Sequence, residues 1–383
     1  MGTFEHFDLK MIKPDFSSEI TGLIMELEHL RNKQLSGLTH PDIFFQLKHI
    51  FHMLESIGSA RIEGNNTTVA EYIESRFESE RNLSHGIIEI QNAEKAMQFI
   101  EENIHTNNID RRFISELHKI VVKDLLPPPD GEGDNTPGEF RMKNVKIAKS
   151  AFTPPDYLTV PSYMEELVSF IINNNLRQYD LLKTAIAHHR FVWIHPFLNG
   201  NGRTVRLLTY AMLVKQGFNV NTHRILNPTA IFCVDRDEYY NKLAKADSGI
   251  ENDITEWCEY VLSGLKREIE KIDRLLDYSY LKNTILIPAV QFSLERKYIT
   301  NIESKILQRA LEVKNQEISA GDLKAILKKH PSAVSRYISQ LKKEKMLMPV
   351  LNKPRKYIIS FSNNFLLRGI IDALGKNGFL AVK

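Results

Sequence analysis

The chain has 383 residues, of which 43% are hydrophobic and 25% charged, and its formal net charge is +3. These values are ordinary for a globular protein of two or three domains, and no apolar stretch approaches the length that would cross a membrane. The two cysteines, Cys233 and Cys258, are too few for a disulfide framework and lack metal-ligand spacing. Because the N-terminus also lacks the basic-then-apolar order of a signal peptide, we predict a cytoplasmic protein with no membrane partner.

The first half of the chain predicts a succession of helices. Apolar residues recur at helical spacing, and turn signals such as Pro127-Pro128-Pro129 separate the segments. The predicted helices are Ile20–Gln34, Ile43–Ile57, Ile87–Asn103, Arg111–Leu125, Pro161–Asn173 and Asp180–Trp193. One short β-compatible segment, Asn144–Ala148, follows a turn that ends at Arg141. We therefore expect a mainly α fold with a small hairpin.

A helix end is predicted at Glu63. Ser59 and Glu63 are four residues apart, so a hydroxyl and a carboxylate share one helix face. Gly64 is suited to the C-terminal cap, and Thr68 to Glu71 has the spacing of a capping box for the next helix. The residues alone indicate a helix, a turn and a second helix, with Glu63 as a solvated charge.

The most informative stretch is His195–Arg206, with the sequence HPFLNGNGRTVR. A turn of Gly200, Asn201 and Gly202 leads into an apolar-periodic helix, whose N-terminus offers free N–H groups to an anion. Arg203 and Arg206 lie three residues apart on one helix face, so both can reach one polyphosphate. A titratable imidazole beside a phosphate cradle predicts transfer from a nucleotide to a hydroxyl, with His195 as general base. We expect Phe197 to pack into the core, and His188 and His189 to be structural.

This stretch closely resembles the signature of the Fic family, His-x-Phe-x-(Asp/Glu)-Gly-Asn-Gly-Arg-x-x-Arg. Most enzymes of that family move AMP from ATP onto a Ser, Thr or Tyr hydroxyl of a protein, so the resemblance implies ATP and Mg²⁺ as cofactors and a target protein or the chain itself as acceptor. Asn199 stands where the family has the acidic residue that holds magnesium. An amide oxygen supplies no charge, so we expect weak metal binding at Asn199.

The resemblance also gives Glu63 a role. Ser59, Glu63 and Gly64 match the family's inhibitory motif, (Ser/Thr)-x-x-x-Glu-(Gly/Asn), in which the glutamate pairs with the second arginine, here Arg206. Such a pair would remove the cation that the γ-phosphate needs and misalign the α-phosphate. The resemblance therefore implies autoinhibition.

Two further regions correspond to family features. The family's hairpin is a flap that clamps a target peptide by strand addition, and here its residues would be Asn144, Val145, Lys146 and Ile147, although a purely structural hairpin is the alternative. The segment from Tyr239 to Gly249 resembles the adenine-side helix, where Tyr240 could pack on the base or lie in the core. Asp247 replaces a frequent asparagine and can accept a hydrogen bond from adenine but not donate one.

The C-terminal region differs in character. Predicted helices Ile302–Val313, Ala320–Lys329 and Ser332–Lys345 precede a strand-turn-strand, an order that looks like a winged helix-turn-helix with Arg336 on its recognition helix. From Gly321 to Lys356 ten basic residues face two acidic ones, a net of +8. This concentration favours DNA as a partner, although winged helices also serve as dimer or protein-binding modules.

We therefore predict four regions and one leading function. The regions are an N-terminal helical part with the inhibitory motif (1–89), a Fic core (90–265), a helical connector (266–299) and a winged-helix domain (300–383). The leading function is an autoinhibited protein adenylyltransferase. The alternatives are an enzyme that removes AMP or uses another nucleotide, and a DNA-binding regulator whose Fic core is weak or a relic. A homodimer is compatible with the sequence.

Overall fold

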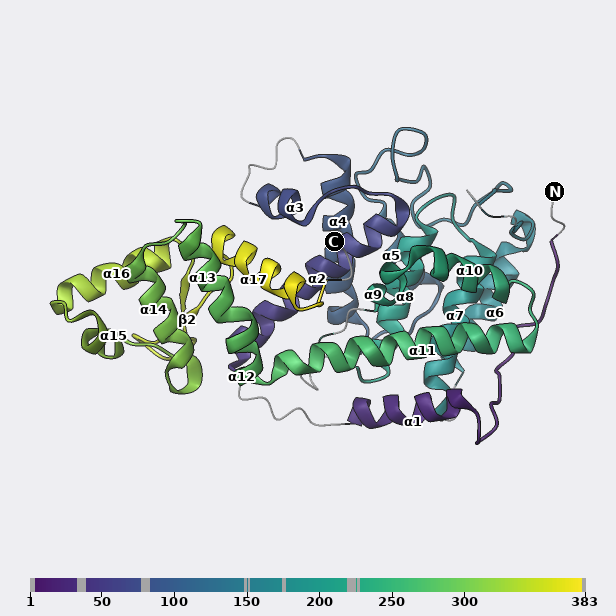
Figure 1. Ribbon diagram of the computed structural model, residues 1–383. Helices are drawn as coiled ribbons and strands as arrows, with labels where there is room; N and C mark the ends of the chain where they lie inside the picture. The colour runs from purple at the N-terminus through teal and green to yellow at the C-terminus, as the bar shows by residue number, and fades with distance from the viewer. Residues whose placement is uncertain are drawn as a thin grey trace.

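The computed structural model describes residues 4–32, 39–76, 83–147, 150, 152–173, 177–218, 225 and 228–380, and it is mainly α-helical (Figure 1). The predicted fold class is therefore confirmed. The helices of the N-terminal region are α1 (Glu19–Asn32), α2 (Pro41–Glu63) and α3 (Val69–Ser75). The helices that follow are α4 (His85–Asn103), α5 (Arg111–Val121), α6 (Val160–Ile172), α7 (Asp180–Ile194), α8 (Asn201–Lys215), α9 (Thr229–Val234), α10 (Arg236–Ala246) and α11 (Glu251–Asp273).

Helix α2 runs six residues beyond the predicted Ile43–Ile57 and so includes Ser59 and Glu63. Gly64 ends it in the left-handed conformation, with φ of 108°, and the Gly64 N–H bonds to the carbonyls of Ala60 and Arg61. The predicted capping box follows, in which Thr68 and Glu71 bond to each other's backbone N–H groups and α3 begins. The predicted helix end at Glu63 is thus confirmed, and it fixes where the Glu63 side chain starts.

Two hydrophobic clusters organise the molecule, and α2 contributes to both. The first surrounds α7 and α8 and includes Trp193, Phe197 and Trp257. The second joins the first part of α2 to the C-terminal helices. Ile62, near the end of α2, belongs to the first cluster, whereas Ile43 and Ile57 belong to the second. In Figure 1, α2 accordingly runs from the C-terminal elements toward α8 and α9.

The C-terminal region is helical with one small sheet. Its helices are α12 (Tyr278–Leu281), which continues through a π-helical turn (Lys282–Leu286) into α13 (Ile287–Glu295), then α14 (Asn301–Glu312), α15 (Ala320–Leu327), α16 (Pro331–Lys343) and α17 (Asn364–Lys376). Strands β1 (Leu347–Pro349) and β2 (Tyr357–Ile359) pair antiparallel, with Leu347 opposite Ile359. The three helices and the strand pair lie where the sequence predicted them, and the winged-helix assignment itself stays a prediction.

The segment predicted as a flap hairpin differs from its expectation. Asn144–Ile147 are described and form no strand, while Ala148 lies outside the described residues. A strand needs a partner at hydrogen-bond distance, which the local sequence does not specify. Helix α11 also passes through the predicted boundary at 265/266 without a break. None of the helices in the described ranges is long and apolar enough to span a membrane.

Candidate active site

The frame of the site is a strained turn between α7 and α8. His195 caps α7 in the left-handed conformation, with φ of 51°, and Gly200 precedes α8 with φ of 73°. Left-handed backbone at a residue other than glycine costs free energy and is found preferentially at functional positions. The turn thus places His195 at the end of α7, five residues before Gly200, which precedes α8.

Buried side chains hold this turn in shape. The Asn201 amide bonds to both backbone groups of Phe197, accepting from its N–H at 3.0 Å and donating to its carbonyl at 2.9 Å. Phe197 is buried, as predicted, and its ring stacks on His118 with centroids 3.7 Å apart. Asn201, which the sequence assigned to phosphate binding, therefore has its side chain committed to the loop.

His118 is a residue of the site that sequence reasoning missed. Its Nδ1 accepts from the Gly138 N–H at 2.8 Å, so Nε2 carries the proton and donates to the Asn199 carbonyl at 3.0 Å. Burial lowers the pKa of His118 to about 4, which keeps the ring neutral in this role. His118 thus ties α5 to the motif loop and to the turn before the predicted flap.

Arg141 is a second residue of the site that sequence reasoning missed. It contacts the backbone of His195. It is buried, and its guanidinium donates to the carbonyls of His195 at 2.9 Å and Pro155 at 2.5 Å. Burial lowers the pKa of His195 to about 4, an effect that the nearby Val192 carbonyl opposes. A neutral imidazole at neutral pH is the form that can accept a proton.

The flap residues begin just after Arg141. Asn144 donates to Asp156 at 2.9 Å and accepts from the Tyr157 N–H at 2.9 Å, which fixes the start of the segment. Val145, Lys146 and Ile147 follow without a strand partner in the described part of this region, and the Ile147 carbonyl accepts from the Ser150 N–H at 3.2 Å. Their role as a flap stays a prediction.

Arg206 is buried, and its guanidinium bonds to residues at the end of α2. Its guanidinium donates to the Glu63 carboxylate at 2.6 Å, to the Ser59 hydroxyl at 2.9 Å and to the Ser59 carbonyl at 3.0 Å. Burial alone would raise the pKa of Glu63, but the charge of Arg206 holds it below 4.5. The structure thus brings together Glu63 and Arg206, which the family resemblance paired, and adds Ser59 of the same motif as a second partner of Arg206.

Gly202 explains how Glu63 can come so close. A Cβ atom at Gly202 would lie 2.1 Å from Glu63 Oε1, so only glycine leaves room for this carboxylate. Gly202 is the second residue of α8, and the N-terminus of a helix attracts anions through its free N–H groups and its dipole. The Glu63 carboxylate therefore occupies the position where the sequence predicted a phosphate.

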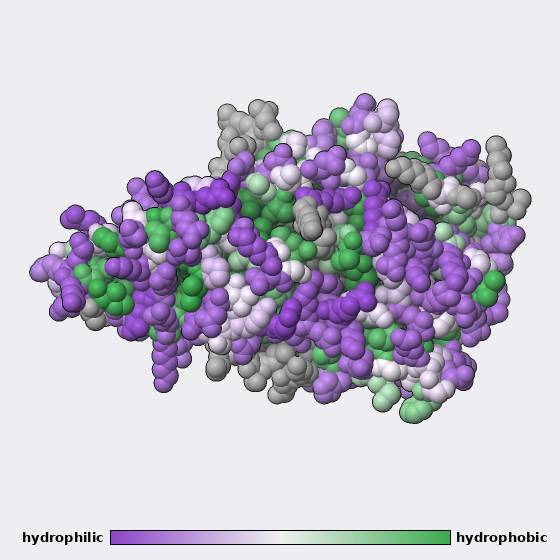
Figure 2. Space-filling model, viewed as in Figure 1, coloured by the Kyte–Doolittle hydropathy of each residue, from purple (hydrophilic) through white to green (hydrophobic). Residues whose placement is uncertain are grey.

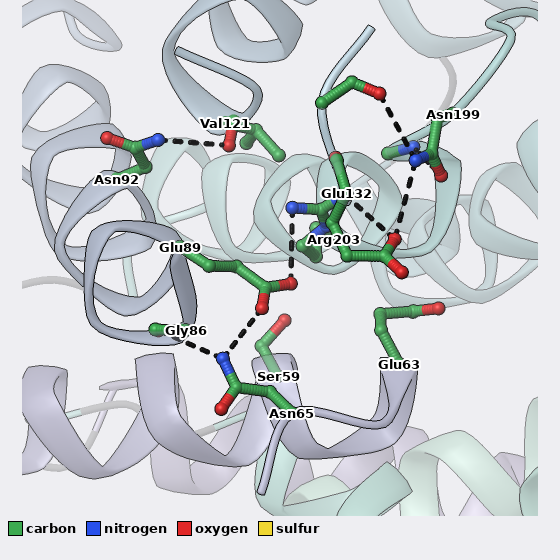
Figure 3. Close-up of polar contacts among 12 residues, drawn as sticks. Ser59, Glu63, Asn65, Gly86, Glu89, Asn92, Val121, Glu132, Asn199 and Arg203 are labelled. Carbon is green, nitrogen blue, oxygen red and sulfur yellow. Dashed lines mark hydrogen bonds and ion pairs between the residues drawn. The ribbon is translucent and has the colours of Figure 1, made fainter. Parts of the chain in front are cut away.

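Arg203 is held by a different carboxylate, which the sequence analysis did not identify. Its Nη1 lies 3.1 Å from Glu89 Oε1, and its Nη2 donates to the Glu132 carbonyl at 2.5 Å. Figure 3 shows Arg203 between Glu89 of α4 and Glu132 of the loop that follows α5. Burial raises the pKa of Glu89, while the charge of Arg203 opposes that rise. Both motif arginines are therefore paired with carboxylates.

Asn199 does not present a metal ligand. Its amide oxygen accepts from the Gly200 N–H at 2.8 Å, and its amide nitrogen faces the Gly133 carbonyl at 3.2 Å and the Glu132 carboxylate at 3.4 Å. No group of three or more His, Cys, Asp or Glu residues within the described ranges could hold a metal ion. These residues do not fit a protein-held Mg²⁺.

The two residues predicted on the adenine side, Tyr240 and Asp247, have different surroundings. Tyr240 is 40% exposed, and its ring lies 5.4 Å from the Arg236 guanidinium. The Tyr240 ring is therefore partly open to solvent, and its contact with an adenine base stays a prediction. Asp247, by contrast, pairs with His189 Nε2 at 2.9 Å. His188 is buried between Thr209 and Tyr239, with hydrogen bonds of 2.7 and 3.0 Å.

Comparisons with known proteins identify the family that the motif resembles. Residues 108–213 match the sequence model described as the Fic/DOC family, which confirms the resemblance. The protein adenylyltransferase Fic of Drosophila grimshawi is 28% identical over 283 residues, which cover 71% of this chain and 51% of that protein. The protein adenylyltransferase Fic of Nematostella vectensis is 26% identical over 255 residues, 64% of this chain and 51% of that protein.

The fold extends beyond the matched segment. The crystal structure of a Fic family protein from Desulfovibrio desulfuricans superposes with a TM-score of 0.57 at 20% identity, covering 93% of this chain and 98% of that one. The chain spans about half the length of the curated relatives named above. The match at 108–213 contains the motif from His195 to Arg206 but not Ser59 or Glu63.

Proposed function

We propose that this chain, with its Fic domain, is an autoinhibited protein adenylyltransferase that moves AMP from ATP to a hydroxyl of a target protein or of itself. The observation that carries the proposal is the Glu63 carboxylate on Arg206 at the N-terminus of α8. An acidic side chain in an anion-binding position imitates the ligand that the position suits. The names of the curated relatives support AMP as the transferred group.

The residues of the site divide the reaction among them. Arg203, Arg206 and the N–H groups at the start of α8 bind and orient the phosphates. The neutral His195 takes the proton of the acceptor hydroxyl as its oxygen bonds to the α-phosphorus. The bond from the α-phosphorus to the bridging oxygen breaks, and pyrophosphate leaves. Tyr240 packs on the adenine base.

The flap and the inhibitory contact set when this reaction occurs. The segment from Asn144 to Ile147, which forms no strand, offers main-chain groups to an extended target peptide. Glu63 excludes the γ-phosphate by occupying its place and by neutralising Arg206. Transfer therefore requires that the end of α2 moves away from Arg206.

Glu63→Gly tests this function. We expect transfer of label from [α-³²P]ATP to rise about 100-fold, because a like charge beside the phosphate costs several kcal/mol and each ~1.4 kcal/mol is tenfold. Mass spectrometry should find one AMP on the modified residue, and His195→Ala in the same background should abolish it. A Glu63→Gly protein that binds ATP and transfers nothing would refute the proposal. Release of AMP from a pre-modified target would favour the reverse reaction.

A second proposed function rests on the exposed face of α16 and the loop after β1. Arg336 on α16 and Arg355 in the loop are exposed, as are Lys342 and Lys343. Figure 2 shows hydrophilic residues over most of this end of the molecule, with small hydrophobic patches between them. A basic helix followed by a basic strand-turn-strand is suited to a DNA duplex.

Arg336→Ala tests DNA binding. We expect affinity for duplex DNA to fall about tenfold, since one lost arginine contact costs ~1–3 kcal/mol. Lys95→Ala, which removes an exposed charge from α4, is the matched control. A gel shift that is independent of salt, or equally weakened by both changes, would contradict a specific role for this surface.

A further inference from the structure

Glu89 is a buried carboxylate outside the motif, and each of its two oxygens has its own partner. Oε1 lies 3.1 Å from Arg203 Nη1, and Oε2 accepts from the Asn65 amide at 2.7 Å. Glu89 is only 4% exposed, so its charge depends on these partners rather than on water. It therefore joins Arg203 of α8 to a residue two positions beyond Glu63.

Asn65 anchors the turn that follows α2. Its amide nitrogen also donates to the Gly86 carbonyl at 2.9 Å, and its amide oxygen accepts from the Thr67 N–H at 2.8 Å. A Cβ atom at Gly86 would come within 2.6 Å of the Thr67 hydroxyl, so glycine lets the turn lie against α4. Figure 3 shows Asn65 reaching both Gly86 and Glu89. The end of α2 is thus pinned to α4 close to where Glu63 begins.

Arg203 is oriented but not saturated. Its Nη1 meets Glu89 as an ion pair without an aligned hydrogen bond, and its Nε is buried with no hydrogen-bond partner among the described residues. A buried donor without a partner is costly, so it favours an acceptor supplied by a ligand. Arg206, in contrast, has Nε bonded to Ser59 and Nη2 bonded to Glu63.

We propose that Glu89 is a positioning residue for the transfer reaction, which orients Arg203 toward the nucleotide phosphates and, through Asn65, holds Glu63 on Arg206. This inference rests on the proposed function. Asn65 acts on the brake because it fixes the turn from which Glu63 projects. Glu89 acts on the phosphate site because it fixes the guanidinium that remains when the brake is released. Neither residue touches the reacting atoms.

The two tasks separate when variants are made with and without the brake. Asn65→Ala in the wild-type background should raise self-modification at least tenfold, and in the Glu63→Gly background it should change nothing. Asn66→Ala is the matched control, because Asn66 is the exposed neighbour with the same side chain. Glu89→Gln in the Glu63→Gly background should raise the KM for ATP about tenfold with little change in kcat, and Glu89→Asp should recover part of the loss.

Binding of a fluorescent ATP analogue and the melting temperature complete the test. A folded Glu89→Gln/Glu63→Gly protein with unchanged KM and unchanged analogue affinity would overturn the positioning of Arg203. Asn65→Ala that stays as silent as wild type, while Glu63→Gly is active, would overturn the anchoring of the brake. If Glu63→Gly transfers nothing, the proposed function fails, and the analogue affinity of Glu89→Gln still decides whether Glu89 positions Arg203.

Discussion

Helix α8 carries two similar arginines that pair with glutamates from different helices. Arg203 pairs with Glu89 of α4, which we call the α4 side, and Arg206 pairs with Glu63 of α2, which we call the α2 side. Arg203 and Arg206 are one helical turn apart, and each is about 2% exposed and paired with a glutamate. Glu89, the partner on the α4 side, is 4% exposed, whereas the Glu63 side chain on the α2 side keeps 25% of its surface in contact with solvent. The two pairs therefore differ in how readily they can be broken.

This difference separates a scaffold contact from a removable one. Glu63 can regain water when it leaves Arg206, which lowers the cost of opening, whereas Glu89 would lose its partner inside the protein. Glu63 also projects from the last residue of a helix, while Glu89 lies in the first half of the 19-residue helix α4. A ligand that replaces one carboxylate would displace Glu63 before Glu89.

The largest expected effect is a difference in unfolding free energy between variants of the two arginines. Arg203→Met should cost about 3–5 kcal/mol of unfolding free energy, because it leaves the buried Glu89 without its charge partner. Arg206→Met should cost about 1–2 kcal/mol, since Glu63 can turn toward water and methionine keeps much of the buried stem. Urea unfolding measures both.

A repair variant controls for lost packing. Glu89→Leu combined with Arg203→Met should recover most of the loss, because an apolar pair can replace a buried ion pair. Equal losses for the two arginine variants would contradict the proposed difference between the sides.

Gly202→Ala should disrupt the Glu63–Arg206 pair and leave the Glu89–Arg203 pair intact. The new Cβ atom would meet Glu63 Oε1 at 2.1 Å and Arg206 Nη1 at 3.2 Å, and no atom of Glu89 or Arg203 is among its nearest contacts. We expect Glu63→Gln to cost about 1–2 kcal/mol in the wild type, as a lost charged hydrogen bond does, and nothing measurable once Gly202→Ala is present. A double-mutant cycle from urea unfolding measures this, and an undiminished effect of Glu63→Gln would show that the carboxylate tolerates the Cβ atom.

Much of the α2 side could be predicted from the sequence. Gly64 and the capping box mark the helix end by local rules, and the motif resemblance supplied the partner of Glu63. The α4 side could not be assigned, because the partners of Glu89 come from α8 and from the turn after α2. One signal was present: the helical period places Glu89 on the buried face with Ala93 and Ala96.

The other missed residues have the same cause. Arg141 bonds to a carbonyl 54 residues away and His118 to one 81 residues away, distances over which no local pattern operates. The expected strand at Asn144–Ile147 failed for a related reason, since pairing depends on a second segment. Most of the predicted helices, which need only local hydrogen bonds, lie within about four residues of their predicted ends, whereas α2 runs six residues beyond Ile57 and α17 was not predicted.

The smallest expected effect is that the contributions of Glu63 and Glu89 to stability change with pH in opposite directions. The folded-state pKa of Glu63 lies below 4.5, so its stabilising contribution is present above 4.5 and is lost as pH falls through the folded value. The pKa of Glu89 lies above 4.5, so its contribution to stability is present below pH 4.5 and is lost as pH rises through the folded value.

The stability of wild type relative to Glu63→Gln should therefore increase with pH across the acid range. The stability of wild type relative to Glu89→Gln should decrease above pH 4.5. Urea unfolding between pH 3.5 and 7 measures both differences. Slopes of the same sign would mean that the two carboxylates share one environment and that the α4 pair is as open to water as the α2 pair.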